Sequence, residues 1–206
     1  MIFSVIGDIR GDLKALHAVL DHVENAGIQV ILHAGNAVVG GPDGDAVIDR
    51  LRRAGVHCVL GAEDKLAVRF SRKREALRKR LEPELFTALE AAHARLGSGN
   101  LEFLAHLHAS RHVEIDNMSI YVCADADSRR SGPDLPPARL RRLREQALAD
   151  VILCGGAAEP FTTTVDGTLI VFPGPLHAGP GLARYALVDT DGPSMAATFP
   201  EVSFAP

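Results

Sequence analysis

The segment Ile2-Phe-Ser-Val-Ile-Gly-Asp-Ile-Arg-Gly-Asp12 decides the fold. Its first five residues are mostly apolar and are followed by Gly7 and Asp8, which is typical of a buried strand that ends in a loop. Leucine and valine then recur at helical spacing over residues 13–23, and Gly27 supplies a C-terminal stop. The start of the chain therefore predicts a strand, a glycine-bearing loop and a helix, in that order.

The same unit follows twice more along the chain. Residues 30–32 predict a second strand, residues 46–51 a second helix closed by a glycine, and residues 56–60 a third strand. Successive strand–loop–helix units predict a parallel sheet with right-handed crossovers. The loops that follow the strands form the ligand crevice of such a sheet. Here these loops span residues 7–12, 35–43 and 61–64.

The rest of the chain predicts a helical segment and then further strands. Residues 65–108 show helical spacing without a strand pattern. Residues 111–124 predict a hairpin that turns at Asp116-Asn117, and Asp166-Gly167 predicts a second hairpin turn. A helix is expected over 136–148, and strands are expected over 151–154, 162–165, 168–172 and 185–188. We find no linker, so residues 1–206 are expected to form a single domain.

Composition narrows the classes of function. Of the 206 residues 47% are apolar and 23% charged, which is the profile of a globular protein. The net charge of −4 makes nucleic acid an unlikely partner, and no apolar run is long enough to span a membrane. The three cysteines lie in predicted strands and their number is odd, so we expect free buried thiols and a reducing, cytoplasmic location.

Six short motifs, in order and in register, mark the ends of these strands. They are Gly7-Asp-Ile-Arg-Gly-Asp12, Ala34-Gly-Asn-Ala-Val-Val-Gly-Gly-Pro42, Gly61-Ala-Glu-Asp64, Val122-Cys-Ala-Asp125, Cys154-Gly-Gly-Ala-Ala-Glu-Pro-Phe161 and Phe172-Pro-Gly-Pro175. The series resembles the calcineurin-like metallophosphoesterases, above all the small bacterial and archaeal phosphodiesterases, whose motifs read GDIHGN, LGDxVGYGP, GNHD, VHGSP, GHTHxPF and NPGS. The resemblance implies an α/β fold, a four-layer α/β/β/α sandwich, with a dinuclear metal site at the strand ends.

The residues that the family uses to hold two metal ions are mostly replaced. The first aspartate is kept as Asp8, but its histidine partner is Arg10, a permanent cation without a lone pair. The bridging aspartate is Asn36, whose amide oxygen carries no charge. The Asn-His pair of the GNHD motif is Ala62 and Glu63. Asp8 and Asn36 are therefore the only remnants of this half of the metal site.

The later motifs have lost their ligands as well. The three later histidines of the family fall on Ala124, Gly156 and Ala158, and the Asn and Ser of NPGS fall on Phe172 and Pro175. The chain has no histidine between residues 57 and 93 or between residues 112 and 177, so no shift of register restores them. We therefore expect no metal cofactor.

The replacements form a pattern of their own. Arg10 can supply the counter-charge that a buried Asp8 needs, and Glu63 can accept from the same guanidinium. We therefore expect a cluster of Asp8, Arg10 and Glu63 in place of the metal ions. Candidate site residues are Asp8, Arg10, Asn36, Glu63 and Asp64. Candidate ligand-binding residues are Arg10, Gly11, Asn36, Glu63, Asp125 and His177. Asp8, Asn36 and Asp64 also have purely structural interpretations.

Three functions remain open from the sequence. The first is a pseudoenzyme without a dinuclear centre that binds a small anionic ligand or a protein partner and can form a homodimer. The second is a phosphoesterase with a mononuclear site for magnesium or manganese, built from Asp8, Asn36, Glu63 and Asp125. The third is an adaptor for nucleic acid or acidic partners that uses the basic segment Arg69–Arg80.

Overall fold

The first sheet is built around strand β1 (Ile2–Ile6). In this computed structural model, which describes residues 1–124, 132–192 and 194–205, β1 pairs in parallel with β2 (Ile31–His33), and β2 pairs in parallel with β3 (His57–Cys58). On its other side β1 is antiparallel to β11 (Ala186–Asp189), which is antiparallel to β12 (Ala196–Thr198). The predicted run of three parallel strands is confirmed.

The second sheet carries the two predicted hairpins. Its strand order is β4 (Ser110–Ile115), β5 (Met118–Cys123), β6 (Val151–Cys154), β8 (Thr168–Phe172) and β7 (Phe161–Val165). Strands β5, β6 and β8 are parallel, and β4 and β7 pair antiparallel to them at the two edges. Both hairpin turns are at the predicted places, and their residues adopt positive φ angles.

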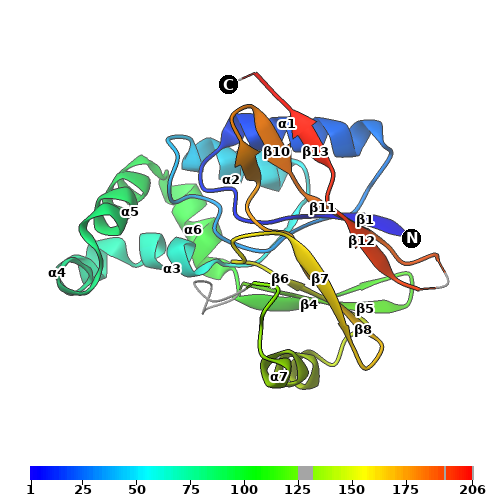
Figure 1. Ribbon diagram of the computed structural model, residues 1–206. Helices are drawn as coiled ribbons and strands as arrows, with labels where there is room; N and C mark the ends of the chain where they lie inside the picture. Colours follow the sequence, from blue (N-terminus) through cyan, green and yellow to red (C-terminus); the bar gives the residue numbers. More distant parts are fainter. Residues whose placement is uncertain (125–131, 193, 206) are drawn as a thin grey trace.

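The two sheets stack with helices outside them, as Figure 1 shows. Alternate residues of β1 serve two cores: Phe3 and Val5 face the second sheet, and Ile6 belongs to the core under α1 (Leu13–Asn25) and α2 (Gly44–Arg53). Helix α7 (Pro137–Ala147) covers the outer face of the second sheet. The expected four-layer α/β/β/α sandwich is confirmed.

The part of the chain between β3 and β4 is helical, as predicted. It consists of α3 (Ala62–Val68), α4 (Phe70–Arg80), α5 (Pro83–Arg95) and α6 (Ser98–His106). These helices extend from one side of the sandwich in Figure 1. Across the described residues, no helix is both long and apolar enough to cross a bilayer.

Two parts of the fold differ from the sequence prediction. The third strand is shorter than residues 56–60, because Leu60 donates its N–H to His108 instead of continuing the ladder with β2. A small sheet of β9 (His177–Gly179), β10 (Leu182–Arg184) and β13 (Glu201–Ser203) was not predicted. It packs on α1 beside the first sheet.

Candidate functional site

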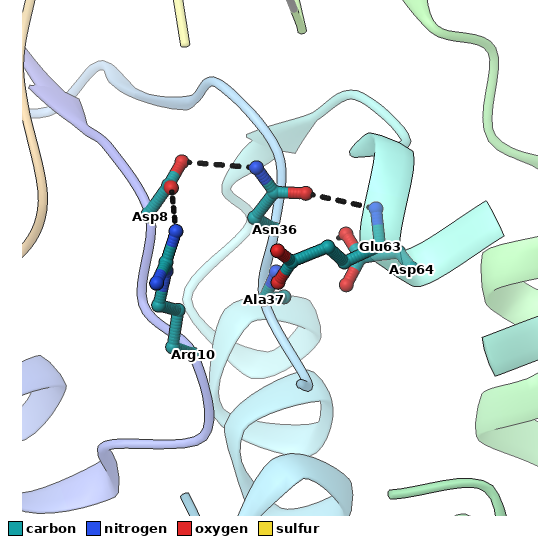
Figure 2. A network of polar contacts seen from close by, with 6 residues as sticks. All are labelled: Asp8, Arg10, Asn36, Ala37, Glu63 and Asp64. Atoms are coloured by element: carbon teal, nitrogen blue, oxygen red, sulfur yellow. Dashed lines mark hydrogen bonds and ion pairs between the residues drawn. The ribbon is translucent and has the colours of Figure 1, made fainter. Parts of the chain in front are cut away.

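Asp8 lies at the end of β1, and both of its carboxylate oxygens have a side-chain partner (Figure 2). The Nη2 atom of Arg10 lies 3.1 Å from Oδ2, and the Nδ2 atom of Asn36 lies 3.2 Å from Oδ1. Asp8 is 4% exposed, so an unpartnered charge here would be costly. The two partners therefore stabilise the negative charge of Asp8, as a bound cation would otherwise do.

Asn36 connects two of the strand-end loops. Its amide donates to Asp8, and its Oδ1 atom accepts from the backbone N–H of Glu63 at 3.1 Å (Figure 2). The bond from Glu63 fixes the amide orientation, because a backbone N–H can only donate. Asn36 adopts a φ of 61°, a left-handed conformation that asparagine tolerates better than most residues. The side chain is thereby held with neither amide end free.

Arg10 adopts a φ of 54°, which is less usual for a side chain of this size. Its backbone N–H donates to the carbonyl of Asn36 at 3.0 Å, which helps to hold this conformation. The side chain is 54% exposed even though it contacts the buried Asp8. Arg10 therefore reaches from the buried carboxylate to the surface.

The expected cluster of Asp8, Arg10 and Glu63 is present in part. The Asp8–Arg10 ion pair is confirmed. The third member differs: within the described residues no ion pair joins Arg10 to Glu63, and Glu63 reaches the cluster through its backbone N–H and Asn36. Asn36 is thus the residue that completes the cluster. The signal for this role was its side chain, because an amide can donate to one group and accept from another.

Burial raises the pKa of the Asp8 carboxyl above its usual range, against the opposing effects of the Arg10 charge, the Asn36 amide and a backbone hydrogen bond from Gly156. Gly156 is one of the positions where the family has a histidine. A backbone group of that loop therefore helps to stabilise the charged form of Asp8.

The loops of the later motifs meet the same strand ends. A Cβ atom added to Gly35 would lie 3.0 Å from the Cβ of Ala124, and one added to Gly155 would lie 2.0 Å from the carbonyl oxygen of Ala34. A Cβ on Gly61 would lie 2.0 Å from the backbone nitrogen of Asn36. The glycines are required because the backbones touch. The loops that carry Asn36, Ala62, Ala124 and Gly156 therefore lie against one another.

Asp64 serves the scaffold of the site. Its carboxylate accepts from the backbone N–H groups of Ala37 and Val38 at 3.1 Å each and from that of Gly61 at 3.2 Å. It is 1% exposed, and burial raises its pKa despite these bonds. This geometry agrees with the structural interpretation, because the side chain braces the loop after β2 against the start of α3.

Two further candidates, His177 and Gly11, make other contacts. The Nδ1 atom of His177 lies 3.1 Å from Oδ2 of Asp12, whose other oxygen caps α1 through Ala15. The backbone N–H of Gly11 is already bonded to the carbonyl of Ala37. The backbone N–H of Gly11 is therefore not available to an anion, and His177 contacts Asp12 at the start of α1. Asp125 lies outside the described residues.

The donor set does not fit a pair of divalent cations. Such a site needs several neutral imidazoles and carboxylates with free lone pairs. Here both oxygens of Asp8 face hydrogen-bond donors, and the Asn36 oxygen is bonded to a backbone N–H. Within the described ranges, no group of three or more His, Cys, Asp or Glu residues is placed to hold a metal ion.

Comparison with known proteins identifies the family. Residues 1–192 match the family described as the calcineurin-like phosphoesterase superfamily domain. No curated protein sequence matches the chain. The hypothetical protein PH1004 from Pyrococcus horikoshii OT3 has a similar structure, with a TM-score of 0.79 and 21% identity over 99% of this chain and 88% of that one.

Two further structures share the fold. A metallophosphoesterase from Sphaerobacter thermophilus has a TM-score of 0.68 and 20% identity, over 100% of this chain and 89% of that one. Vps29 from Entamoeba histolytica, in a complex with Zn2+, has a TM-score of 0.57 and 17% identity over 100% of both chains. With the match over residues 1–192 and the six motifs at the strand ends, the chain belongs to the calcineurin-like phosphoesterase superfamily.

Proposed function

We propose that this protein is a pseudoenzyme that uses the metallophosphoesterase fold for binding, without a dinuclear metal centre. The observation that carries the proposal is that both carboxylate oxygens of Asp8 already accept a hydrogen bond from a side chain. Arg10 and Asn36 occupy its two oxygens, and Arg10 supplies a fixed positive charge where the family would place cations. A water molecule in such a site would have no metal ion to lower its pKa, so the family's route to a hydroxide nucleophile would be lost.

The ligand that suits this site best is a small anion. A guanidinium has five N–H donors in a planar fork, which matches the oxygens of phosphate and carboxylate groups. In the described part of the chain the Arg10 side chain bonds to Asp8 alone, and 54% of it is exposed. Its outer donors can therefore meet an oxyanion from solvent while its inner donor stays on Asp8.

The test has a metal arm and an anion arm. We expect protein purified with manganese supplied to hold no stoichiometric metal and to leave a generic phosphodiester intact. Bound manganese together with turnover that is lost in Asp8→Asn would overturn the proposal and favour the mononuclear phosphoesterase. In the anion arm, isothermal titration with inorganic phosphate should give binding that Arg10→Gln abolishes. Arg141→Gln, at an exposed position on α7, is the matched control.

A protein partner is the second candidate. The likeness to Vps29 of Entamoeba histolytica and to vacuolar protein sorting 29 of Cryptosporidium parvum supports such a role. If inorganic phosphate does not bind and metal is absent, the binding function would belong to a protein partner instead of a small anion. Size-exclusion chromatography with light scattering would then separate a homodimer from a complex with another protein.

A further inference from the structure

A cationic groove lies along α3 and α4, away from the Asp8 cluster. We define the cationic groove by its four charged residues, Lys65, Arg69, Lys73 and Arg80. It encloses about 320 Å³, and all four charged residues are exposed at its edges. Its floor is apolar and includes the half-buried Leu66 and the buried Leu77.

Helical spacing places these cations in one row. Arg69 is the N-cap of α4, and Lys73 and Arg80 follow it by four and eleven positions, so the three lie on one side of this helix. Lys65, in the last turn of α3, lines the same groove. At about 1.5 Å per residue, the three cations from Arg69 to Arg80 extend over roughly 16 Å.

One cation of α4 outside the groove, Arg74, has acidic partners. Arg74 is bonded to Glu90 of α5, with Nη2 to Oε1 at 2.6 Å, and it also lies 3.9 Å from Glu75. By contrast, no residue of the cationic groove forms an ion pair with an acidic residue among residues 1–124, 132–192 and 194–205. Positive charge without an acidic partner therefore lines the groove, beside further exposed cations of α4 at Arg72, Arg78 and Lys79.

The groove does not have the features of a nucleic-acid site. Phe70 is the one aromatic residue within the basic segment, and stacking on bases would need it at the surface. It is 3% exposed, and its ring packs against Phe86 and His93 with centroids 5.4 Å and 5.6 Å away. The floor offers leucine in its place, and the chain as a whole carries a charge of −4. An aliphatic floor edged by cations matches a different class of partner.

We infer that the cationic groove is a docking surface for an acidic amphipathic segment of a partner protein. The glutamate or aspartate side chains of this partner segment pair with the row of cations. The leucine-like side chains of the segment cover the floor at Leu66 and Leu77. Desolvation of the floor supplies affinity, and the charges supply register and a faster encounter. Arg10 does not belong to the cationic groove, so this proposal and the proposed anion site are tested independently.

The experiment is a binding titration by fluorescence anisotropy on the full chain. The probe is a labelled helical peptide of glutamate and leucine with glutamates at positions i, i+4, i+7 and i+11, and its control is a scrambled peptide of the same composition. The groove variant is Arg69→Ala, Lys73→Ala and Arg80→Ala together. The matched variant, Arg72→Ala with Arg78→Ala and Lys79→Ala, removes three exposed charges from α4 outside the groove. Lys73→Glu alone is a milder second test.

We expect the patterned peptide to bind more tightly than the scrambled one. The groove variant should weaken binding about ten-fold, since each exposed ion pair contributes up to about 1 kcal/mol. The matched variant should change it by less than about two-fold, and Lys73→Glu should weaken it without loss of helical signal. Equal binding of both peptides, or equal losses in the two triple variants, would refute the inference. Tighter binding of single-stranded RNA or DNA 12-mers would assign the surface to nucleic acid instead.

Discussion

The most informative single residue for stability is His33, the last residue of β2. It pairs with Ile6 on one side and Cys58 on the other, and it is 1% exposed. Neither of its ring nitrogens has a hydrogen-bond partner among the described residues. Burial lowers its pKa from 6.5 to about 4, because a charged imidazole would have to leave water. Folding therefore keeps His33 neutral in conditions where the unfolded chain would protonate it.

The size of the effect follows from these two pKa values. Since the folded pKa is the lower one, the unfolded state binds more protons as the pH falls, and stability is lost between pH 6.5 and about 4. Each unit of difference corresponds to about 1.4 kcal/mol, so the whole window is worth roughly 3 kcal/mol. Between pH 7 and pH 5 alone, His33 should remove about 2 kcal/mol from the free energy of unfolding.

The assay is urea unfolding of the wild type and of His33→Leu at pH 7, 6 and 5, followed by circular dichroism. The wild type should lose about 2 kcal/mol more than the variant over this range. His57, whose pKa is also lowered by burial, and Asp8 and Asp64, whose raised pKa values act with the opposite sign, are present in both proteins and cancel. His17→Gln, at an exposed position on α1, should behave like the wild type. Parallel pH profiles for wild type and His33→Leu would refute the reasoning.

Three further predictions concern the strand ends. Asp64→Ala should lower the free energy of unfolding by about 3 kcal/mol or more, because it leaves three buried N–H groups without an acceptor; a loss below 1 kcal/mol in urea would contradict the bracing role. Gly61→Ala should cost a similar amount, since its Cβ would lie 2.0 Å from the backbone nitrogen of Asn36. Gly99→Ala, in helix α6 with nothing within 4 Å, should instead stabilise by up to about 1 kcal/mol, so equal effects of the two substitutions would contradict the packing argument. Burial raises the pKa of the Cys58 thiol to about 12, so it should react with a disulfide reagent only in guanidinium; rapid labelling of the native protein would disprove its burial.

The three parallel strands of the first sheet could be predicted because a glycine follows each of them within three residues. Hydrophobic runs that stop at Gly7, Gly35 and Gly61 define strands, and the helices between them force the parallel order. The small sheet could not be predicted in this way. Its strands are three residues each, too short for alternation to identify them, and β10 and β13 pack on α1.

Some contacts of the candidate site could also be predicted from the sequence, and others could not. The pairing of Asp8 with Arg10 was predictable, because the two side chains stand two residues apart in one loop and carry opposite charges. The bond from Asn36 to Asp8 joins residues 28 positions apart, so it depends on how β1 and β2 are registered. The use of the Glu63 backbone depends on the first turn of α3, where backbone N–H groups have no partner within the helix and that of Glu63 bonds to Asn36.

The pairing of β1 with β11 has a consequence for synthesis on the ribosome. Ile2 pairs with Asp189, so the edge of β1 that binds β11 stays uncovered until residues 186–189 have been synthesised. The second sheet uses residues 110–172 and can close earlier. During translation the nascent chain therefore exposes an unpaired apolar strand edge, a state prone to aggregation. We expect production of this protein to depend on elongation rate and chaperone supply more than its final stability would indicate.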